Sequence, residues 1–369
     1  MAALANSLTL AAAAVGCSDP NPRVGCILIA AAADGVRLGI GHTQAAGSPH
    51  AEVMALRAAR AVGHDTRGAT AYVTLEPCAH HGRTPPCCDA LIEAGIAKVV
   101  VAIEDPNPLV AGRGIARLRA AGIEVEIVGG EWGHASRELN IGFFSRMIRG
   151  RPWVRMKVAA SLDGRTALAS GASQWITGEA ARADGHAWRK RAGAVLTGIG
   201  TVRDDDPRLD VRLVPTVNQP LRVVVDSKLE MAASARIVQP PGRALVYTAS
   251  DDAARLSALA APHIEVARLP VNAQGKTDLA AMLLDLARRE VNELHVEAGE
   301  KLNGSLLREG LVDELLVYIA PRLLGPGRGI AAIGPLASLA ESLDFEFVDV
   351  ERVGTDLRLR LRAPGRAVF

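Results

Sequence analysis

The stretch TLEPCAHHGRTPPCCDAL at residues 74–91 concentrates the side chains of this chain that bind metals best. It holds three of the five cysteines, and the other two, Cys17 and Cys26, also lie in the first quarter of the 369 residues. A disulfide framework is typical of short secreted domains, whereas this long chain has no cysteine after Cys88. The cluster therefore predicts a metal site in a reducing compartment.

A histidine and a carboxylate precede this stretch, at the start of a predicted helix. His50-Ala51-Glu52 forms an H-x-E pattern, and Pro77-Cys78 follows it in the cysteine-rich stretch. Zinc deaminases combine H-x-E with P-C-x-x-C, and in them the glutamate is not a metal ligand. One imidazole and two thiolates suit zinc, and three protein ligands leave a fourth position for water, as catalytic sites do. A structural zinc loop is the alternative, but it has no use for a carboxylate two residues from its histidine.

The spacing leaves the choice of ligands open. The second half of the pattern is stretched here to P-C-x8-C, and the cysteine that ends it has a neighbour, Cys88. Adjacent cysteines in the first turn of a helix cannot easily point at one ion. His80 and His81 lie inside the loop and could bind as well.

The first half of the chain alternates strand-like and helix-like segments around this cluster. The run KVVVAIED at 98–105 is nearly all apolar, which is typical of a strand buried on both faces. The alternation predicts an α/β sandwich. We expect strands at 24–30, 35–42, 69–76, 98–105 and 124–129, helices at about 4–15, 50–62, 89–94, 114–122 and 130–144, and a turn around Asp34-Gly35.

The segment Arg149-Gly150-Arg151-Pro152 interrupts this pattern, and a second α/β series follows it. A chain of 369 residues is too long for one ordinary domain, so we place two domains at 1–148 and 149–369. In the second series, strands are expected at 153–160, 193–198, 221–227, 244–249, 294–299 and 315–320, a helix at 277–290, and a terminal hairpin at 345–353 and 355–362.

Composition excludes several classes of protein. A net charge of +2 and an aromatic content of 3% give no reason to expect a nucleic-acid partner. The sequence AAAAVGC at 11–17 resembles the end of a signal peptide, but no cationic residue precedes Arg23. We expect a helix there, with Leu4, Leu8, Ala11, Ala12 and Val15 on one face. No run approaches the roughly 18 apolar residues of a membrane span, so the sequence predicts a soluble, cytoplasmic protein.

Two glycine-containing segments of the second half could bind phosphate. Gly198-Ile199-Gly200 and Gly299 to Ser305 each stand where a predicted strand gives way to a helix or turn, where backbone N–H groups are free. The pattern alone is weak, because a tight turn needs the same glycines.

Taken together, the motifs resemble the family of riboflavin-biosynthesis deaminases, in which the deaminase is fused to a reductase. The resemblance covers nearly the whole chain, in order. It implies a cytidine-deaminase-like three-layer α/β/α domain followed by a dihydrofolate-reductase-like α/β domain. It rests on NPRVG (21–25), PHAEVMAL (49–56), TLEPCAHHGRTPPCCDALI (74–92), EDPNPLVAGRG (104–114), KVAASLDGRTA (157–167), SQWITG (173–178), LTGIGTVRDDDPRL (196–209), VVDS (224–227) and VEAGEKLNGSLL (296–307).

For the deaminase, the resemblance implies one zinc ion held by His50, Cys78 and Cys87, with Glu52 as the catalytic acid and base. Cys88 would then only pack nearby. Asn21 is implied as a substrate contact, together with the loop of His80, His81 and Arg83. Zinc lowers the pKa of its water from about 15.7 toward roughly 7.

For the reductase, the resemblance implies NADPH as co-substrate. Glu300 is unexpected there, because it places a negative charge in a loop that should approach phosphate. Arg189 and Arg212 suit a sugar phosphate, since guanidinium groups bind phosphate oxygens in pairs. NADPH contacts are implied for Ala159, Trp175, Thr201, Asp205, Ser227, Gly299, Glu300, Lys301, Leu302, Asn303, Gly304 and Ser305, and substrate contacts for Ser173, Arg189, Leu209, Arg212 and Glu297.

The sequence thus predicts a bifunctional enzyme of riboflavin synthesis. Its deaminase would act on diaminohydroxyphosphoribosylaminopyrimidine, and its reductase would convert the ribosyl chain of the product to ribityl. A nucleic-acid or free-base deaminase with an unrelated appendage is one alternative, and a zinc-stabilised binding protein without activity is another. The expected partner is a small phosphorylated pyrimidine, without nucleic acid or membrane. A homo-oligomer is compatible with the sequence, which does not define the oligomeric state.

Overall fold

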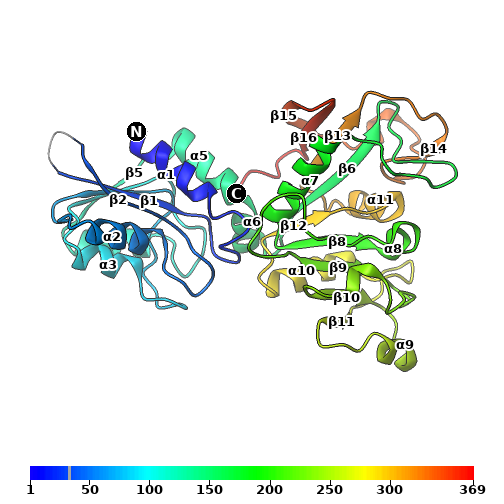
Figure 1. Ribbon diagram of the computed structural model, residues 1–369, viewed down its shortest axis with the longest axis horizontal. Coiled ribbons are helices and arrows are strands. Elements are labelled where there is room, and N and C mark those ends of the chain that lie inside the picture. The colour runs from blue at the N-terminus through cyan, green and yellow to red at the C-terminus, as the bar shows by residue number, and fades with distance from the viewer. Residues whose placement is uncertain (32–34) are drawn as a thin grey trace. The chain divides into compact units, whose positions relative to one another are not determined.

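A computed structural model describes residues 1–31 and 35–369, so Asp34 of the expected turn lies outside the described residues. The chain forms two compact units, Met1–Gly150 and Arg151–Phe369 (Figure 1). None of the described helices has the length and apolar character needed to span a bilayer.

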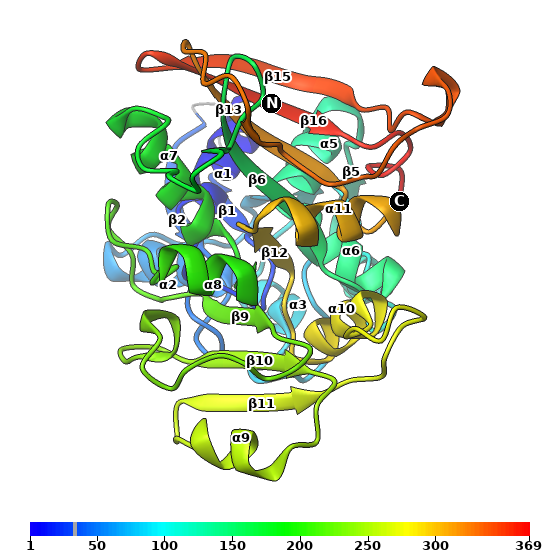
Figure 2. The ribbon, with the colours of Figure 1, turned by 90° about the vertical axis from the view of Figure 1, so that its right-hand side faces the viewer.

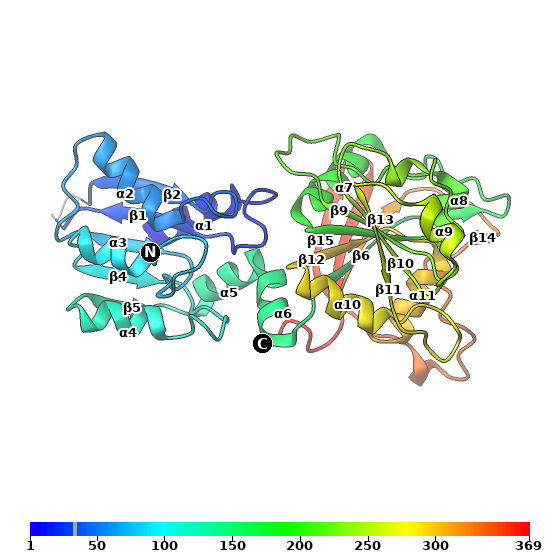
Figure 3. The ribbon, with the colours of Figure 1, turned by 90° about the horizontal axis from the view of Figure 1, so that it is seen from below.

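The N-terminal unit is a five-stranded sheet with helices on both faces (Figure 3). The strand order is β2-β1-β3-β4-β5; β1 is antiparallel to β2 and β3, and β3, β4 and β5 are parallel. Helices α1 and α5 cover one face, and α2, α3 and α4 cover the other. The elements are α1 Ala2–Ala12, β1 Gly25–Ile29, β2 Arg37–His42, α2 Ala51–Ala61, β3 Thr70–Val73, α3 Cys87–Glu93, β4 Lys98–Val101, α4 Arg113–Ala120, β5 Glu124–Ile127, α5 Gly130–Leu139 and α6 Ile141–Arg149.

Glycines let the helices lie directly on the strands of this sheet. A Cβ on Gly39 would lie 2.2 Å from the backbone oxygen of Ala55, and one on Gly41 would lie 2.3 Å from that of Ala51. Gly25 meets α1 in the same way, 1.9 Å from the oxygen of Ser7. Larger residues would push α2 off β2, and α2 is the helix that begins beside His50.

Two expectations for this unit need correction. The first helix forms, with Leu4 and Ala11 buried, but Ala12 is exposed. The single helix expected at 130–144 is two helices, because Asn140 interrupts it. The amide of Asn140 binds both backbone groups of Arg23, accepting from its N–H at 2.7 Å and donating to its carbonyl at 3.0 Å.

The C-terminal unit is built on a nine-stranded sheet in the order β11-β10-β9-β8-β12-β6-β13-β16-β15, from one edge to the other (Figure 2). The strands from β11 to β13 run parallel, and β16 and β15 add an antiparallel hairpin, as expected. Its elements are β6 Trp153–Ser161, β7 Ala167–Leu168, α7 Glu179–Arg191, β8 Ala194–Gly198, α8 Ile199–Asp205, β9 Leu221–Val225, η1 Arg236–Val238, β10 Ala244–Thr248, α9 Ala253–Ala258, β11 Ile264–Arg268, α10 Leu279–Arg288, β12 Glu293–Val296, α11 Glu300–Arg308, β13 Glu314–Ala320, β14 Gly327–Arg328, η2 Leu339–Glu341, β15 Glu346–Val353 and β16 Asp356–Arg362.

Helices pack on both faces of this sheet. On one face α10 and α11 form the main apolar core, in which Met282, Leu286 and Leu306 are fully buried against β6, β8 and β12. On the other face α8 and η1 pack over β8, β9 and β10, and α7 packs over β13. Strand β11 was not predicted from the sequence, because it is short and only partly buried. The mixed α/β fold expected for both halves is confirmed.

Candidate active sites

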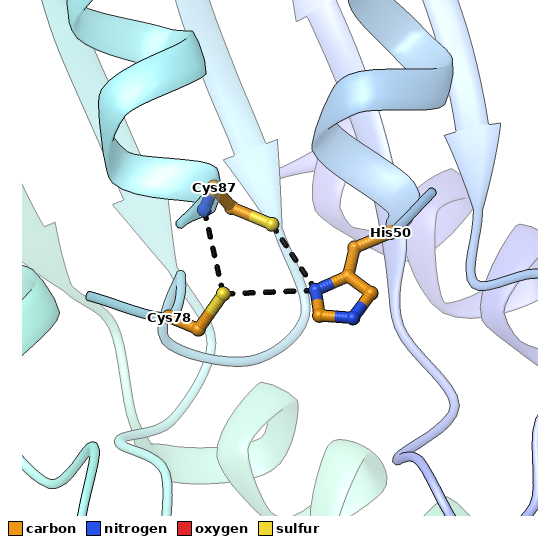
Figure 4. Close-up of side chains that lie close together, drawn as sticks. All are labelled: His50, Cys78 and Cys87. Carbon is orange, nitrogen blue, oxygen red and sulfur yellow. Dashed lines mark hydrogen bonds between the residues drawn. The ribbon is translucent and has the colours of Figure 1, made fainter. Parts of the chain in front are cut away.

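Two helix N-termini and one loop of the N-terminal unit bring three metal-binding side chains together (Figure 4). His50 is the N-cap residue of α2, Cys78 lies in the loop after β3, and Cys87 is the first residue of α3. One ligand atom of each lies within 4.8 Å of the others. No second group of this kind occurs among the described residues, so His80 and His81 stand apart from it.

The donor atoms point at one another. His50 Nδ1 lies 3.2 Å from Cys87 Sγ and 3.6 Å from Cys78 Sγ, and Figure 4 shows the three side chains converging. Cys88 Sγ points away and donates to the carbonyls of Pro77, at 3.3 Å, and Gly114, at 3.5 Å. A borderline-soft set of one imidazole and two thiolates fits zinc, and a tetrahedral ion would keep one open position.

The protonation of the cluster agrees with a cation site. The hydrogen bond with Cys87 lowers the pKa of the Cys78 thiol well below its usual range, and the same contact raises that of Cys87. Its hydrogen bond with Cys78 raises the pKa of His50. The lowered pKa favours the thiolate form of Cys78, the form in which a cysteine binds a metal ion. On the far side of the imidazole, Nε2 lies 3.4 Å from Thr84 Oγ1, which can orient the ring.

Glu52 has the burial that a proton-transferring carboxylate needs. It lies in the first turn of α2 and is only 3% exposed. Burial, followed by the charge of Cys78, raises its pKa and so favours proton uptake. A carboxylate with a raised pKa is suited to general acid–base catalysis near neutral pH.

Glu76, which the sequence analysis did not single out, anchors the ligand loop. Its carboxylate is 3% exposed and accepts four backbone N–H groups, from Asp105 at 3.2 Å, Gly112 at 3.0 Å, Gly114 at 2.9 Å and Ile115 at 3.1 Å. A Cβ on Gly114 would lie 1.9 Å from the carbonyl of Pro77, so only glycine fits there. Because Glu76 stands two residues before Cys78, the segment 105–115 holds this ligand in place.

We therefore expect Glu76→Gln to loosen the metal site. The amide NH2 would face N–H donors, and each donor left without an acceptor costs about 1–3 kcal/mol. Urea unfolding of the N-terminal unit and titration with Co²⁺ should show lower stability and weaker metal binding. Glu104→Gln, at an exposed carboxylate of the same loop, is the control and should change neither. Equal behaviour of the two variants would contradict the anchoring role.

The C-terminal unit contains a cavity of about 1380 Å³ at the carboxyl ends of β8, β9 and β12 and beside the second half of β6. Ligands of open α/β sheets bind at this edge. The cavity brings together nearly all residues expected for the reductase. Lining it are Ala159, Ser173, Trp175, Arg189, Thr201, Asp205, Leu209, Arg212, Ser227, Glu297, Gly299, Glu300, Lys301, Leu302, Asn303 and Ser305.

The expected phosphate loop is the N-terminus of α11. Gly299 is its N-cap residue, and the Gly299 N–H donates to Thr201 Oγ1 of α8 at 3.1 Å. The carboxylate of Glu300 accepts the N–H of Gly329 at 3.1 Å. This backbone donor partly compensates the negative charge that was unexpected in a phosphate-binding loop. Asn303 donates to the carbonyl of Ile330 at 3.0 Å. Gly304 does not line the cavity: a Cβ there would lie 2.1 Å from the carbonyl of Ala332.

Most of the Arg189 side chain is buried, and it forms an ion pair. Its Nε and Nη2 donate to the two oxygens of Glu297, the second at 2.9 Å, and Nη1 donates to the carbonyl of Asp210 at 2.9 Å. Lys157 Nζ lies 3.6 Å from Glu297, and these cations hold the pKa of that buried carboxyl well below its usual range. Arg212 is more open, at 44% side-chain exposure, with its Nη1 2.6 Å from Asp210 Oδ1.

Ser173 and Trp175 line the cavity, whereas Asp163 and Asn21 lie outside its lining. Ser173 donates to Asp205 at 3.2 Å, and Trp175 is 59% exposed with Arg182 4.7 Å above its ring. Asp163 accepts the N–H groups of Leu324 and Gly325 and so holds a loop. In the other unit, Asn21 lies in the loop before β1, and its contact with substrate stays a prediction.

Comparison with known proteins agrees with both sites. Residues 2–103 match the family model for the cytidine and deoxycytidylate deaminase zinc-binding region, and residues 152–359 match that for the RibD C-terminal domain. The riboflavin biosynthesis protein RibD of Escherichia coli is 46% identical over 97% of this chain and 98% of its own, and that of Aquifex aeolicus is 41% identical over 95% of each.

Two solved structures are similar over 98% of this chain and of their own. One is Acinetobacter baumannii RibD, with a TM-score of 0.87 and 41% identity. The other, from Thermotoga maritima, is described as a diaminohydroxyphosphoribosylaminopyrimidine deaminase/5-amino-6-(5-phosphoribosylamino)uracil reductase, with a TM-score of 0.87 and 34% identity.

The fold and the two sites define an enzyme that joins a zinc-type deaminase domain to a reductase domain. The chain belongs to the RibD family of riboflavin biosynthesis proteins. It is accordingly both a hydrolase and an oxidoreductase, as the sequence predicted.

Proposed function

We propose that the chain deaminates a diaminohydroxyphosphoribosylaminopyrimidine and then reduces the ribosyl group of the resulting aminouracil to ribityl. We assign the first step to residues 1–148, with one zinc ion, and the second to residues 149–369, with NADPH. The observation that carries the proposal is the presence, in one chain, of the His50, Cys78 and Cys87 group, with the buried Glu52 in the first turn of α2, and of the large cavity beside α11.

In the first step, water replaces an amino group of the pyrimidine and ammonia leaves. Zinc, when bound, supplies the Lewis acidity that lowers the pKa of water. Glu52 accepts the proton of the attacking water and passes it to the departing nitrogen. Its burial and raised pKa fit both halves of that transfer.

In the second step, hydride adds to C1′ of the ribosyl group and a proton reaches the ring oxygen, so that the ring opens to ribityl. The role of the chain is to hold the two reactants in the cavity. The α11 N-terminus offers N–H groups to the diphosphate of NADPH, and Arg212 is open to bind the substrate phosphate.

Separate assays of the two steps test the proposal. Ammonia should be released from the phosphorylated pyrimidine and not from free cytosine, and NADPH should be oxidised only when the deaminated product is present. Release from free cytosine would favour the free-base deaminase, and no release from either compound would favour a binding protein without activity. Oligomeric state and a cytoplasmic location stay predictions.

Arg189→Ala and Arg212→Ala should have different effects: the first should lower the stability of the protein, and the second should raise KM for the substrate. Loss of exposed Arg212 should raise KM for the phosphorylated substrate by removing hydrogen bonds of about 1.5–3 kcal/mol, with little effect on folding. Loss of Arg189 leaves the carboxylate of Glu297 buried without its main partner, which costs about 3–5 kcal/mol in a buried pair. Substrate kinetics and thermal unfolding of each variant separate the effects, and a stable Arg189→Ala protein with only a raised KM would contradict this difference.

A further inference from the structure

The order of the strands determines which residues line each end of the cavity. Along the sheet the strands β9, β8, β12 and β6 are neighbours in this order; β9, β8 and β12 contribute their carboxyl ends to the cavity, and β6 contributes residues 157–159. Because neighbouring strands lie about 4.8 Å apart, the end of β9 is about 10 Å from the end of β12 and about 14 Å from β6 at the same level of the sheet. Lys157 lies in the middle of β6, level with the end of β12, where Glu297 follows the last strand residue, and α11 begins just after β12.

A dinucleotide whose diphosphate meets α11 and whose reactive ring lies at β6 must extend its adenosine half toward β9. Three residues follow β9 there, namely Asp226, Ser227 and Lys228. Asp226 is fully buried, and its Oδ2 accepts the N–H of Met231 at 2.8 Å. Its Oδ1 has no hydrogen-bond partner in the described structure, but the side chain has no exposed surface at which it could accept hydrogen bonds from ribose hydroxyls, the role that an acidic residue plays in enzymes that use NADH.

A turn beyond β11 adds a second lysine at this end of the cavity. Ser227 Oγ accepts the N–H of Thr277 at 2.9 Å and lies 3.0 Å from its hydroxyl, which ties the turn to the end of β9. Asn272 Oδ1 shapes the turn by accepting the N–H groups of Gln274, at 3.1 Å, and Lys276, at 3.0 Å. Lys276 directly precedes Thr277, and Lys228 directly follows Ser227. The hydrogen bonds between Ser227 and Thr277 therefore bring the two lysines close together in the chain fold, and both line the cavity.

These lysines differ from several other cations of the cavity. Arg203 pairs with Glu230 at 3.3 Å, Arg212 with Asp210 at 2.6 Å, and Arg328 with Asp204 at 2.5 Å. Within residues 1–31 and 35–369, neither Lys228 nor Lys276 lies within ion-pair distance of a carboxylate. Two exposed ammonium groups without a partner, beside a serine hydroxyl, form a site for a phosphate monoester.

We infer that Lys228 and Lys276 bind the 2′-phosphate on the adenosine ribose of NADPH and so make the reductase select NADPH over NADH. The inference rests on the proposed function, in which NADPH is the reductant, and it adds the residues that recognise it. NADH carries hydroxyl groups alone at this ribose and gains nothing from the two charges.

Isothermal titration of the full-length protein with NADPH and with NADH tests the inference. Lys228→Ala and Lys276→Ala should each raise the Kd for NADPH about 10-fold, as loss of one charge-assisted hydrogen bond does, and the double variant should lose more. The Kd for NADH should stay within about twofold in all three variants. Lys301→Ala is the matched control: it removes the same charge from the first turn of α11, and it should weaken both nucleotides by the same factor.

Three results would overturn the inference: equal Kd values of the unmodified protein for NADPH and NADH, unchanged NADPH binding in the double variant, or equal losses for both nucleotides in the lysine variants. An unmodified protein that binds neither nucleotide would instead refute the proposed reductase co-substrate itself. The two kinds of failure are therefore distinguishable.

Discussion

Glu52→Gln is expected to slow deamination by at least about 10²–10⁴-fold, the usual contribution of a positioned acid or base. The amide keeps the size of the side chain but can neither accept the proton of water nor return it to the departing nitrogen. Glu52 is not part of the converging donor set, so the variant should keep its metal. Reduction should also be unchanged, because the cavity of the other unit is lined by residues from 157 onward.

Metal analysis and separate assays of the two steps measure this result. Glu93→Gln, at an exposed carboxylate at the end of α3, is a suitable control and should be active in both steps. Loss of zinc from Glu52→Gln would make Glu52 a ligand and would refute its assignment as the proton carrier. Full deaminase activity of the variant would refute that assignment as well.

The sequence predicted best those features of the fold that depend on residues close together in the chain. The alternation of strands and helices and the hairpin at the C-terminus follow from periodicity and turn residues, which act over short stretches. Strand β11 and the break at Asn140 could not be predicted in this way. Asn140 interrupts a helical pattern only because its amide finds both backbone groups of Arg23, 117 residues away.

The residues of the metal site were likewise only partly predictable from the sequence. The spacing of residues 74–91 left Cys87, Cys88, His80 and His81 as competing ligands, and the resemblance to a family selected among them. The fold adds the physical reason, since the first turn of α3 aims one thiol at His50 and the other at the carbonyl of Pro77. Glu76 could not be recognised at all, because its four N–H partners come from residues 105–115. The partnership of Arg189 with Glu297 likewise depends on the meeting of α7 with β12.

Cys87→Ser and Cys88→Ser should show which of the two adjacent cysteines binds the metal. The two thiols are adjacent in α3 and both buried, so the same substitution tests the direction in which each points. Structural zinc sites with four ligands bind with about 10–16 kcal/mol, or about 2.5–4 kcal/mol for each ligand, so the loss of Cys87 should weaken metal binding by about 10²–10³-fold. Deamination should be lost with the metal, and reduction should continue.

Cys88→Ser should keep both metal and deaminase activity. The serine hydroxyl can donate to the carbonyls of Pro77 and Gly114 as the thiol does, so the loop that carries Cys78 stays in place. Co²⁺ provides the readout, because its thiolate charge-transfer absorption reports the number of sulfur ligands without any assay of activity. The signal should fall in Cys87→Ser and persist in Cys88→Ser. A reversed pattern, or equal losses in both variants, would show that the ion is held by a different pair of sulfurs, and the orientation of α3 described above would then be wrong.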